Sequence, residues 1–202
     1  MEPFVLAITG ASAQRLGERA LQVLLEQEQN VHLIVSKGAH LVWESEIGIQ
    51  IPVNPQLQEK FWRDHLGTSK GSLTCHKWND QSACIASGSY KTRGMLIIPS
   101  TMGTVGRIAS GISLDLIERT ADVHLKESRP LLICPREMPW NLIHLRNLTS
   151  LAEAGAKIAP PIPGWYTDPK SVDDIVDFII VRIFDSFGLE VIDFPRWKQE
   201  KQ

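Results

Sequence analysis

The stretch FVLAITGAS, residues 4–12, decides the fold of this chain. Its first five residues are all apolar, which predicts a strand buried on both faces. A turn of small residues follows, and a helical pattern over residues 12–28 begins within that turn. A buried strand that runs directly into a helix is typical of a βαβ unit, whose strands are parallel.

The same alternation continues along the chain and predicts one α/β domain over residues 1–202. We expect further strands at 31–35, 95–98, 131–134 and 157–159, and an edge strand at 72–77 within the polar segment 67–93. We expect further helices at 39–46, 56–66, 104–110, 114–127, 140–154 and 172–187. This pattern predicts a three-layer, doubly wound parallel sheet of the flavodoxin or Rossmann type.

Composition excludes several classes of function. The net charge of −2 and the lack of a basic cluster argue against a nucleic-acid partner. No apolar run is long enough to span a membrane, and the N-terminus does not resemble a signal peptide. Cys75, Cys84 and Cys134 form no CxxC pair, which predicts a reducing, cytoplasmic location without a disulfide framework or structural zinc. The histidines show no HExxH spacing, and we expect no metal.

Small and hydroxyl-bearing residues follow several of the predicted strands. They are Thr9, Gly10, Ala11 and Ser12 after the first strand, Ser36 after the second, and Ser100, Thr101, Met102, Gly103 and Thr104 after the strand at 95–98. Parallel sheets bind ligands beyond the carboxyl ends of their strands, and helix N-termini there accept anions. A phosphate with a polyhydroxylated chain fits this pattern. A helix cap is the alternative for each position taken alone.

Charged residues at four other places are candidates for chemistry. Arg136 and Glu137, held between two prolines, could clamp a phosphate and exchange a proton, or form a surface salt bridge. Arg119 and Lys126 lie on one helix face, which the pattern alone predicts to be solvated. Arg182 falls inside an apolar stripe and should be buried with a phosphate or a carboxylate partner.

Long motifs carry a closer resemblance. The segments LDLIERTADVHLKE (114–127), PREMPWNLIHLRNL (135–148) and PPIPGWYTDPKSVDDIVDFIIVRIFD (160–185), with the turn at 9–12, closely resemble UbiX-type flavin prenyltransferases. The similarity covers nearly the whole chain and is weakest over 47–93. It implies a homo-oligomer, expected to be a dodecamer, that binds FMN and needs no metal. The implied reaction joins the dimethylallyl group of dimethylallyl phosphate to reduced FMN at N5 and C6, and the prenylated FMN serves UbiD-type decarboxylases.

The resemblance also assigns roles to individual residues. It implies FMN contacts at Gly10, Ala11, Ser12, Ser36, Thr101, Met102, Gly103, Thr104 and Arg136. It implies dimethylallyl phosphate contacts at Arg119, Lys126, Arg136, Tyr166 and Arg182. It implies catalytic roles for Glu46, Lys126 and Glu137, and Trp197 matches a family tryptophan. For Arg119 and Lys126 this overrules the solvated face, because subunit assembly would bring that face to a neighbouring site.

The chain departs from the family pattern at four positions. Ala13 stands where the family usually has glycine, and Thr101, Gly103 and Gln81 stand for a common serine, lysine and tryptophan. Two alternatives to the prenyltransferase remain. One is an FMN-dependent peptidyl-cysteine decarboxylase, disfavoured because the segment 99–104 lacks that family's asparagine. The other is a catalytically silent FMN carrier, disfavoured because the matched acidic and basic residues are retained.

Overall fold

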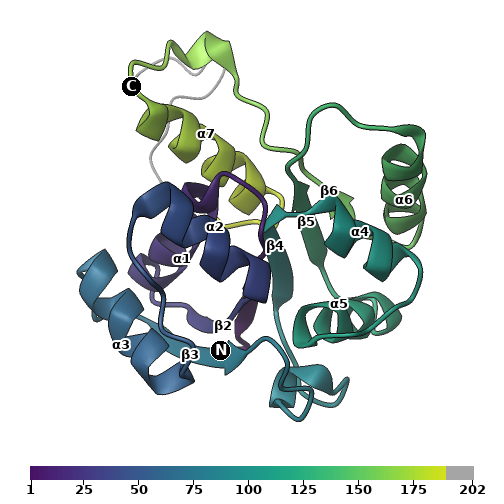
Figure 1. Ribbon diagram of the computed structural model, residues 1–202, viewed down its shortest axis with the longest axis horizontal. Coiled ribbons are helices and arrows are strands. Elements are labelled where there is room, and N and C mark those ends of the chain that lie inside the picture. The colour runs from purple at the N-terminus through teal and green to yellow at the C-terminus, as the bar shows by residue number, and fades with distance from the viewer. Residues whose placement is uncertain (190–202) are drawn as a thin grey trace.

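The computed structural model describes residues 1–189, and its centre is a six-stranded sheet in which every strand pair is parallel (Figure 1). The strands lie in the order β3-β2-β1-β4-β5-β6. Their bounds are β1 Phe4–Ile8, β2 Asn30–Val35, β3 Ser72–Lys77, β4 Gly94–Ser100, β5 Leu131–Pro135 and β6 Lys157–Ile158. The chain reverses its direction of winding between β1 and β4, and this switch point is where doubly wound sheets bind ligands.

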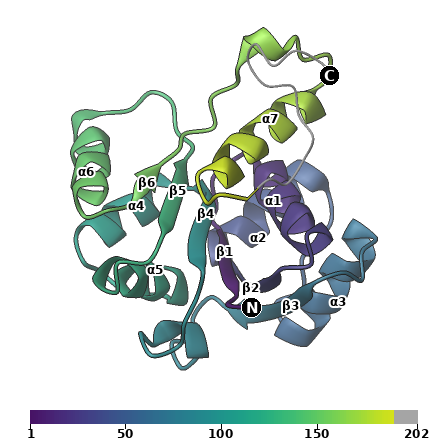
Figure 2. The same ribbon diagram turned by 180° about the vertical axis from the view of Figure 1, so that it is seen from behind.

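Helices cover both faces of the sheet, as the continuous apolar strands require. Residues of α1 (Gln14–Glu26), α2 (Lys37–Ile47), α3 (Pro55–Leu66) and α7 (Val172–Asp185) join one core cluster with alternate strand residues such as Leu6 and Leu33. Residues of α4 (Met102–Ala109), α5 (Leu116–Lys126) and α6 (Leu142–Glu153) join the other cluster, with Val5 and Ile97. The result is a single three-layer α/β domain, seen from behind in Figure 2.

Several helices begin later than the sequence pattern predicts, and each has a local cause. Helix α1 begins at Gln14 rather than at residue 12, because Ala13 has a left-handed backbone with φ of 77°. Helix α5 begins at Leu116, because the Asp115 side chain accepts a hydrogen bond from the Glu118 N–H and caps the helix. Helix α6 begins at Leu142, where the side chain of Asn141 makes the cap.

Helix α7 corrects one expectation from the sequence. Its apolar residues 178–181, 183 and 184 are buried within the chain, where the helix packs against α1. Arg182, expected to be buried, points outward with a side chain 62% exposed and pairs with Asp185 at 3.2 Å. Its long side chain leaves the apolar stripe and reaches water, so the burial of α7 alone does not require a second subunit.

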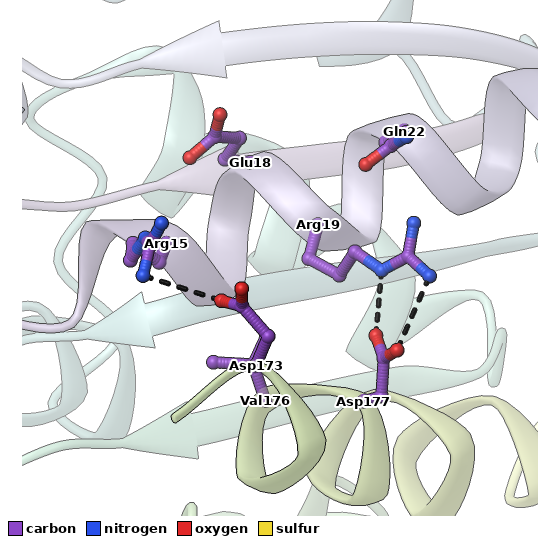
Figure 3. A pocket seen from close by; sticks show the side chains of 7 residues that line it. All are labelled: Arg15, Glu18, Arg19, Gln22, Asp173, Val176 and Asp177. Carbon is purple, nitrogen blue, oxygen red and sulfur yellow. Dashed lines mark hydrogen bonds and ion pairs between the residues drawn. The ribbon is translucent and has the colours of Figure 1, made fainter. Parts of the chain in front are cut away.

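Two ion pairs fasten α7 to α1, as Figure 3 shows. Arg15 reaches Asp173 at 3.2 Å, and Arg19 reaches Asp177 at 2.6 Å. The groove between these helices is lined by these four side chains with Glu18, Gln22 and Val176. None of the predicted site residues lines it. Within residues 1–189, every helix is too short or too polar to cross a membrane.

Candidate functional site

The turn after β1 lies against the start of α2, backbone on backbone. A Cβ atom added at Gly10 would lie 2.8 Å from the carbonyl carbon of Gly38, closer than side chains in proteins come. Only glycine therefore fits at position 10. The same contact places the turn at 9–12 next to Ser36, which caps α2 by accepting a hydrogen bond from the Ala39 N–H at 3.1 Å. Two of the predicted strand ends are thus brought together.

Thr9 joins this turn to the end of β4. Its hydroxyl donates to the Pro99 carbonyl at 2.9 Å and accepts from the Thr101 N–H at 2.8 Å. The side chain is buried, so both hydrogen bonds are shielded from water. Thr101 then caps α4 by accepting a hydrogen bond from the Thr104 N–H at 3.1 Å. The third predicted strand end is therefore fixed beside the first across the switch point.

Gln14 holds the β1–α1 turn from inside the protein. Its side chain is fully buried, and its amide nitrogen donates to the carbonyls of Thr9 at 2.8 Å and Ala11 at 2.6 Å. Nothing in the sequence pattern distinguishes this buried glutamine from a solvated one. Its role follows only from the path of the turn.

Glu46 lies at the N-terminus of α1, where the sequence predicted a bound anion. Its carboxylate accepts hydrogen bonds from the backbone N–H groups of Ala13 at 3.2 Å and Gln14 at 2.9 Å. A negative charge there is stabilised by the free N–H groups and by the helix dipole. Glu46 is therefore next to the predicted flavin-binding turn, although it comes from α2. The first turn of α1 has no side-chain cap of its own.

Residues 101–104 form the N-terminus of α4, and they differ in how far they are buried. Met102 and Thr104 are buried, whereas Gly103 is exposed. The Thr101 and Thr104 hydroxyl oxygens are 3.0 Å apart, so they form a pair of hydroxyls at this helix end. Met102 contributes its side chain to the hydrophobic core, which leaves only its backbone for a ligand.

An ion pair supports this helix from behind. Arg107 pairs with the buried carboxylate of Glu118, and its guanidinium also donates to the Thr104 hydroxyl at 3.4 Å. Glu118 accepts a further hydrogen bond from the Leu114 N–H at 2.7 Å. A cation therefore lies next to Gly103. The sequence pattern does not reveal Arg107 and Glu118, because the pair joins two helices and is not an i,i+4 pattern.

Arg136 follows β5 at the same edge of the sheet, and its backbone N–H donates to the Ser100 carbonyl at 3.0 Å. Its side-chain Nε is buried and has no hydrogen-bond partner among residues 1–189. A buried guanidinium donor without a partner fits an anionic ligand. Glu137 is exposed and accepts a hydrogen bond from the Met138 N–H at 3.1 Å. Residues 1–189 show no Arg136–Glu137 salt bridge, which was the alternative from the sequence.

These residues together fit the phosphate and ribityl chain of FMN. Two helix N-termini, those of α2 and α4, lie at the carboxyl ends of β2 and β4 with the hydroxyls of Ser36, Thr101 and Thr104, and Arg136 with its orphaned donor follows the neighbouring strand β5. The contact between Gly10 and Gly38 keeps the turn narrow enough for a ligand to approach its backbone. Hydroxyl, backbone N–H and guanidinium donors are the groups that bind phosphate.

The basic residues of α5 lie elsewhere in the chain. Lys126 is the last residue of α5, only five positions before β5 begins, so it lies at the amino edge of the sheet and pairs with Glu127. Arg119 pairs with Asp122 at 2.7 Å and donates to the Ala86 carbonyl at 3.1 Å. Neither cation joins Arg136 within one chain.

Tyr166 and Arg182 come from the C-terminal part of the described chain. Tyr166 lies in the short 3₁₀ helix η2 (Trp165–Thr167), which projects at the top of Figure 1, and its ring packs edge-on against Phe178 at 5.7 Å. Arg182 lies in the last turn of α7. Trp197 lies outside the described residues. The structure therefore gathers the predicted flavin-binding residues and Glu46, but it does not gather the predicted second-substrate residues.

Comparisons with known proteins agree with this geometry. The class is that of the flavoproteins, because the family model described as Flavoprotein matches residues 2–184. A flavin prenyltransferase UbiX of Synechocystis sp. is 46% identical over 198 residues, which are 98% of this chain and 96% of the relative. One of Pseudomonas aeruginosa is 41% identical and covers 98% of this chain and 95% of the relative. The chain belongs to the UbiX flavin prenyltransferase family.

Solved structures show the same likeness. AnUbiX in complex with FMN and dimethylallyl pyrophosphate matches with a TM-score of 0.87 and 36% identity, over 99% of both chains. A dodecameric FMN-dependent UbiX-like decarboxylase from Escherichia coli matches with a TM-score of 0.86 and 37% identity, over 98% of this chain and 100% of that one. The epidermin biosynthesis protein EpiD from Staphylococcus aureus is 18% identical with a TM-score of 0.54, and is alike in fold alone.

Proposed function

We propose that this protein is a metal-independent flavin prenyltransferase that joins the dimethylallyl group of dimethylallyl phosphate to reduced FMN. One observation carries the proposal. Polar strand ends and an orphaned arginine donor converge at the switch point of a chain that is 46% identical, over its full length, to a flavin prenyltransferase. Reduced FMN supplies the nucleophile N5 and then C6, and phosphate is the leaving group.

We assign FMN binding to the carboxyl edge of β1, β2 and β4. The hydroxyls of Ser36, Thr101 and Thr104 and the Arg136 guanidinium would hold the phosphate. Gly10, Ala11 and Ser12 would offer backbone atoms and small side chains, and Met102 and Gly103 would offer their backbone. Support for this assignment comes from the orphaned Nε of Arg136, which needs an acceptor. Arg107 would contribute positive charge from behind Thr104.

We assign proton transfer to Glu46 and Glu137, which differ in their surroundings. Glu46 is held by two backbone N–H groups beside the flavin-binding turn. Glu137 is exposed next to Arg136, and its carboxylate accepts a hydrogen bond from the N–H of its own neighbour Met138. Glu137 would protonate the departing phosphate and later accept the proton released on ring closure. Lys126 would stabilise the charge on that phosphate.

The second substrate site needs more than one copy of the chain. Arg119, Lys126, Tyr166 and Arg182 would hold dimethylallyl phosphate together with Arg136, although they lie apart in one chain. We propose a homo-oligomer, a dodecamer, in which different copies supply these residues. Large apolar side chains that are exposed in the single chain support such an assembly. They include Leu114, Met138, Ile143, Ile162 and Trp165.

The proposal also names the enzyme that uses the product and the compartment in which the protein acts. Prenylated FMN would be transferred to a UbiD-type decarboxylase, which uses it as a cofactor. We place the protein in the cytoplasm. The free thiols of Cys75, Cys84 and Cys134 support a reducing compartment.

The test is a mass spectrum of the flavin after anaerobic incubation of the protein with reduced FMN and dimethylallyl phosphate. The extracted flavin should gain the mass of one dimethylallyl group, with release of one phosphate for each flavin converted. The matched control omits dimethylallyl phosphate and should return unmodified FMN. Recovery of unmodified FMN from the complete reaction, with FMN bound to the protein, would refute the enzymatic proposal and leave a flavin carrier.

A further inference from the structure

Two histidines and a cysteine meet on the far side of the sheet from α1. His32 lies in β2 and His76 in the edge strand β3, while Cys84 begins the short 3₁₀ helix η1 (Cys84–Ala86). The register pairs Ile34 with His76, which places both histidine side chains on the same face of the sheet. One ligating atom of each of the three residues lies within 4.8 Å of those of the other two.

The two imidazole rings face each other edge to edge through their nitrogens. Nδ1 of His32 lies 2.7 Å from Nε2 of His76, and Nε2 of His32 lies 3.0 Å from the Tyr90 hydroxyl. A neutral ring that donates from Nε2 to Tyr90 presents a lone pair at Nδ1 towards His76.

We propose that His32, His76 and Cys84 form a binding site for a divalent transition-metal ion of the zinc class. Two imidazole nitrogens and a thiolate are the ligands that zinc prefers, and three protein ligands leave a fourth position for water. Tetrahedral zinc with bonds of about 2.0–2.1 Å to nitrogen sets the two nitrogens about 3.3 Å apart. The rings therefore need to separate by about 0.6 Å, a shift available to His76 on a half-buried edge strand.

Binding would release one proton for each metal ion. The metal takes the place of the proton between the two ring nitrogens, and a neutral His76 then carries its single ring proton on Nδ1. The thiol proton of Cys84 goes to solvent. Tyr90 then orients His32 as an outer partner, because it fixes the proton on Nε2 and leaves Nδ1 for the metal. His76 also lines a groove beside β3, together with Lys77 and Asp80.

This site is separate from the flavin-binding residues. His32 is in the middle of β2, whereas Ser36 follows the carboxyl end of that strand. Cys84 belongs to η1, which packs over the histidine face of the sheet. The inference goes beyond the proposed prenyl transfer and does not depend on it. The pattern of the sequence could not predict the site, because its ligands come from three segments without metal-binding spacing and meet only through the strand register.

The experiment measures zinc binding to the full-length protein by equilibrium dialysis after removal of metals with a chelator. Wild type should bind one zinc ion per chain, and Cys84→Ser and His76→Gln should each weaken zinc binding by at least about 100-fold. Tyr90→Phe should weaken it by about 10–100-fold. His144→Gln, which changes a histidine on α6 away from the cluster, is the matched control and should bind as wild type does. Circular dichroism checks that each variant is folded.

A second readout identifies the ligands directly. Cobalt replaces zinc in such sites and gives a charge-transfer absorption band only when a thiolate is bound. The wild type, freed of flavin, should show this band on addition of Co²⁺, and Cys84→Ser should lack it. The proposal is overturned if the wild type binds no stoichiometric zinc. It is also overturned if folded Cys84→Ser and His76→Gln bind zinc as tightly as the wild type.

Discussion

The carboxylate of Glu46 accepts a hydrogen bond from the backbone N–H of Gln14 at 2.9 Å, and so caps a helix to which it does not belong. The contact joins residues 32 positions apart and links α2 to the start of α1. The same Gln14 holds the β1–α1 turn through its side chain. Glu46 therefore has two separable roles, one in the stability of α1 and one in the proposed proton transfer.

Glu46→Gln should reduce both stability and turnover. Loss of the negative charge at the N-terminus of α1 should lower the free energy of unfolding by about 1 kcal/mol, since a helix-terminal carboxylate and its hydrogen bonds contribute about that much. Turnover should fall by about 10²–10⁴-fold if the carboxylate exchanges protons. Glu44→Gln changes an exposed carboxylate on the same helix and should leave turnover unchanged. Wild-type turnover in Glu46→Gln would limit this residue to capping.

Ala13→Gly should stabilise the protein. Ala13 has a φ of 77°, and a left-handed backbone costs an alanine about 1 kcal/mol more than a glycine. Urea unfolding should therefore give a free energy of unfolding higher by about 0.5–1 kcal/mol. Ala152→Gly, on the exposed surface of α6, is the matched control and should instead lower that free energy by up to about 1 kcal/mol. A loss of stability in Ala13→Gly would contradict the strain assigned to this turn.

Arg136→Gln should weaken FMN binding without unfolding the protein. The buried Nε needs an acceptor, and hydrogen bonds to charged groups are worth about 1.5–3 kcal/mol, so the Kd for FMN should rise by about 10–100-fold. Arg136→Lys keeps the positive charge but loses the planar set of guanidinium donors. Its Kd for FMN should lie between those of the wild type and Arg136→Gln. Arg146→Gln, an exposed arginine on α6, serves as the control. Titration of flavin fluorescence measures all three, and wild-type affinity in Arg136→Gln would exclude this residue from the FMN site.

Glu137→Gln should slow turnover by about 10²–10⁴-fold while FMN affinity and stability stay unchanged. The carboxylate is exposed and accepts a hydrogen bond from the N–H of its own neighbour Met138, so its neutral isostere should not disturb the fold. A turnover assay and an FMN titration on the same variant separate the two effects. Glu153→Gln on α6 is the control. If FMN binding is lost instead, Glu137 supports the loop around Arg136.

Acid should destabilise the protein through His124. Burial is the main reason that the pKa of His124 is lowered to about 4 from 6.5, and its ring nitrogens are hydrogen-bonded to Thr92 and Thr120. Between pH 6.5 and pH 4, His124 is therefore protonated in the unfolded chain but stays neutral in the folded chain. The free energy of unfolding should fall as the pH drops from 6.5 towards 4, by up to about 3 kcal/mol from this residue.

Urea unfolding at a series of pH values measures that dependence. His124→Gln should show a shallower slope between these pH values and a lower free energy of unfolding at neutral pH. His32 has a similarly lowered pKa and should account for part of the remaining slope. An unchanged slope in His124→Gln would show that other groups cause the acid sensitivity.

The sequence predicted the sheet well because its signals are local. The strands at 4–8 and 72–77 have the expected bounds, since apolar runs and alternation are properties of neighbouring residues. The polar strand ends at Ser36 and Thr101 also lie where expected, because parallel strands bring their carboxyl ends to one edge.

What the sequence did not predict depends on contacts between distant segments. The cap from Glu46, the buried bonds of Gln14 and the pair of Arg107 with Glu118 require the folded geometry. Arg182 was wrongly expected to be buried, because helical periodicity does not fix which way a long side chain at the margin of an apolar stripe turns. The proposed role of Lys126 at a neighbouring copy's site came from the family resemblance, because the pattern of the helix alone predicts a solvated face.

Gly10 and Gly38 touch through their backbones, yet they are unequally free to change over evolutionary time. A methyl group added at Gly10 would meet main-chain atoms that cannot move aside, whereas one added at Gly38 would first meet the Gly10 Cα at 3.4 Å. Descendants of this gene should thus keep the first glycine and drift at the second, towards alanine. Evolution can therefore substitute residues at the start of α2, but it cannot substitute the glycine in the turn that faces this helix.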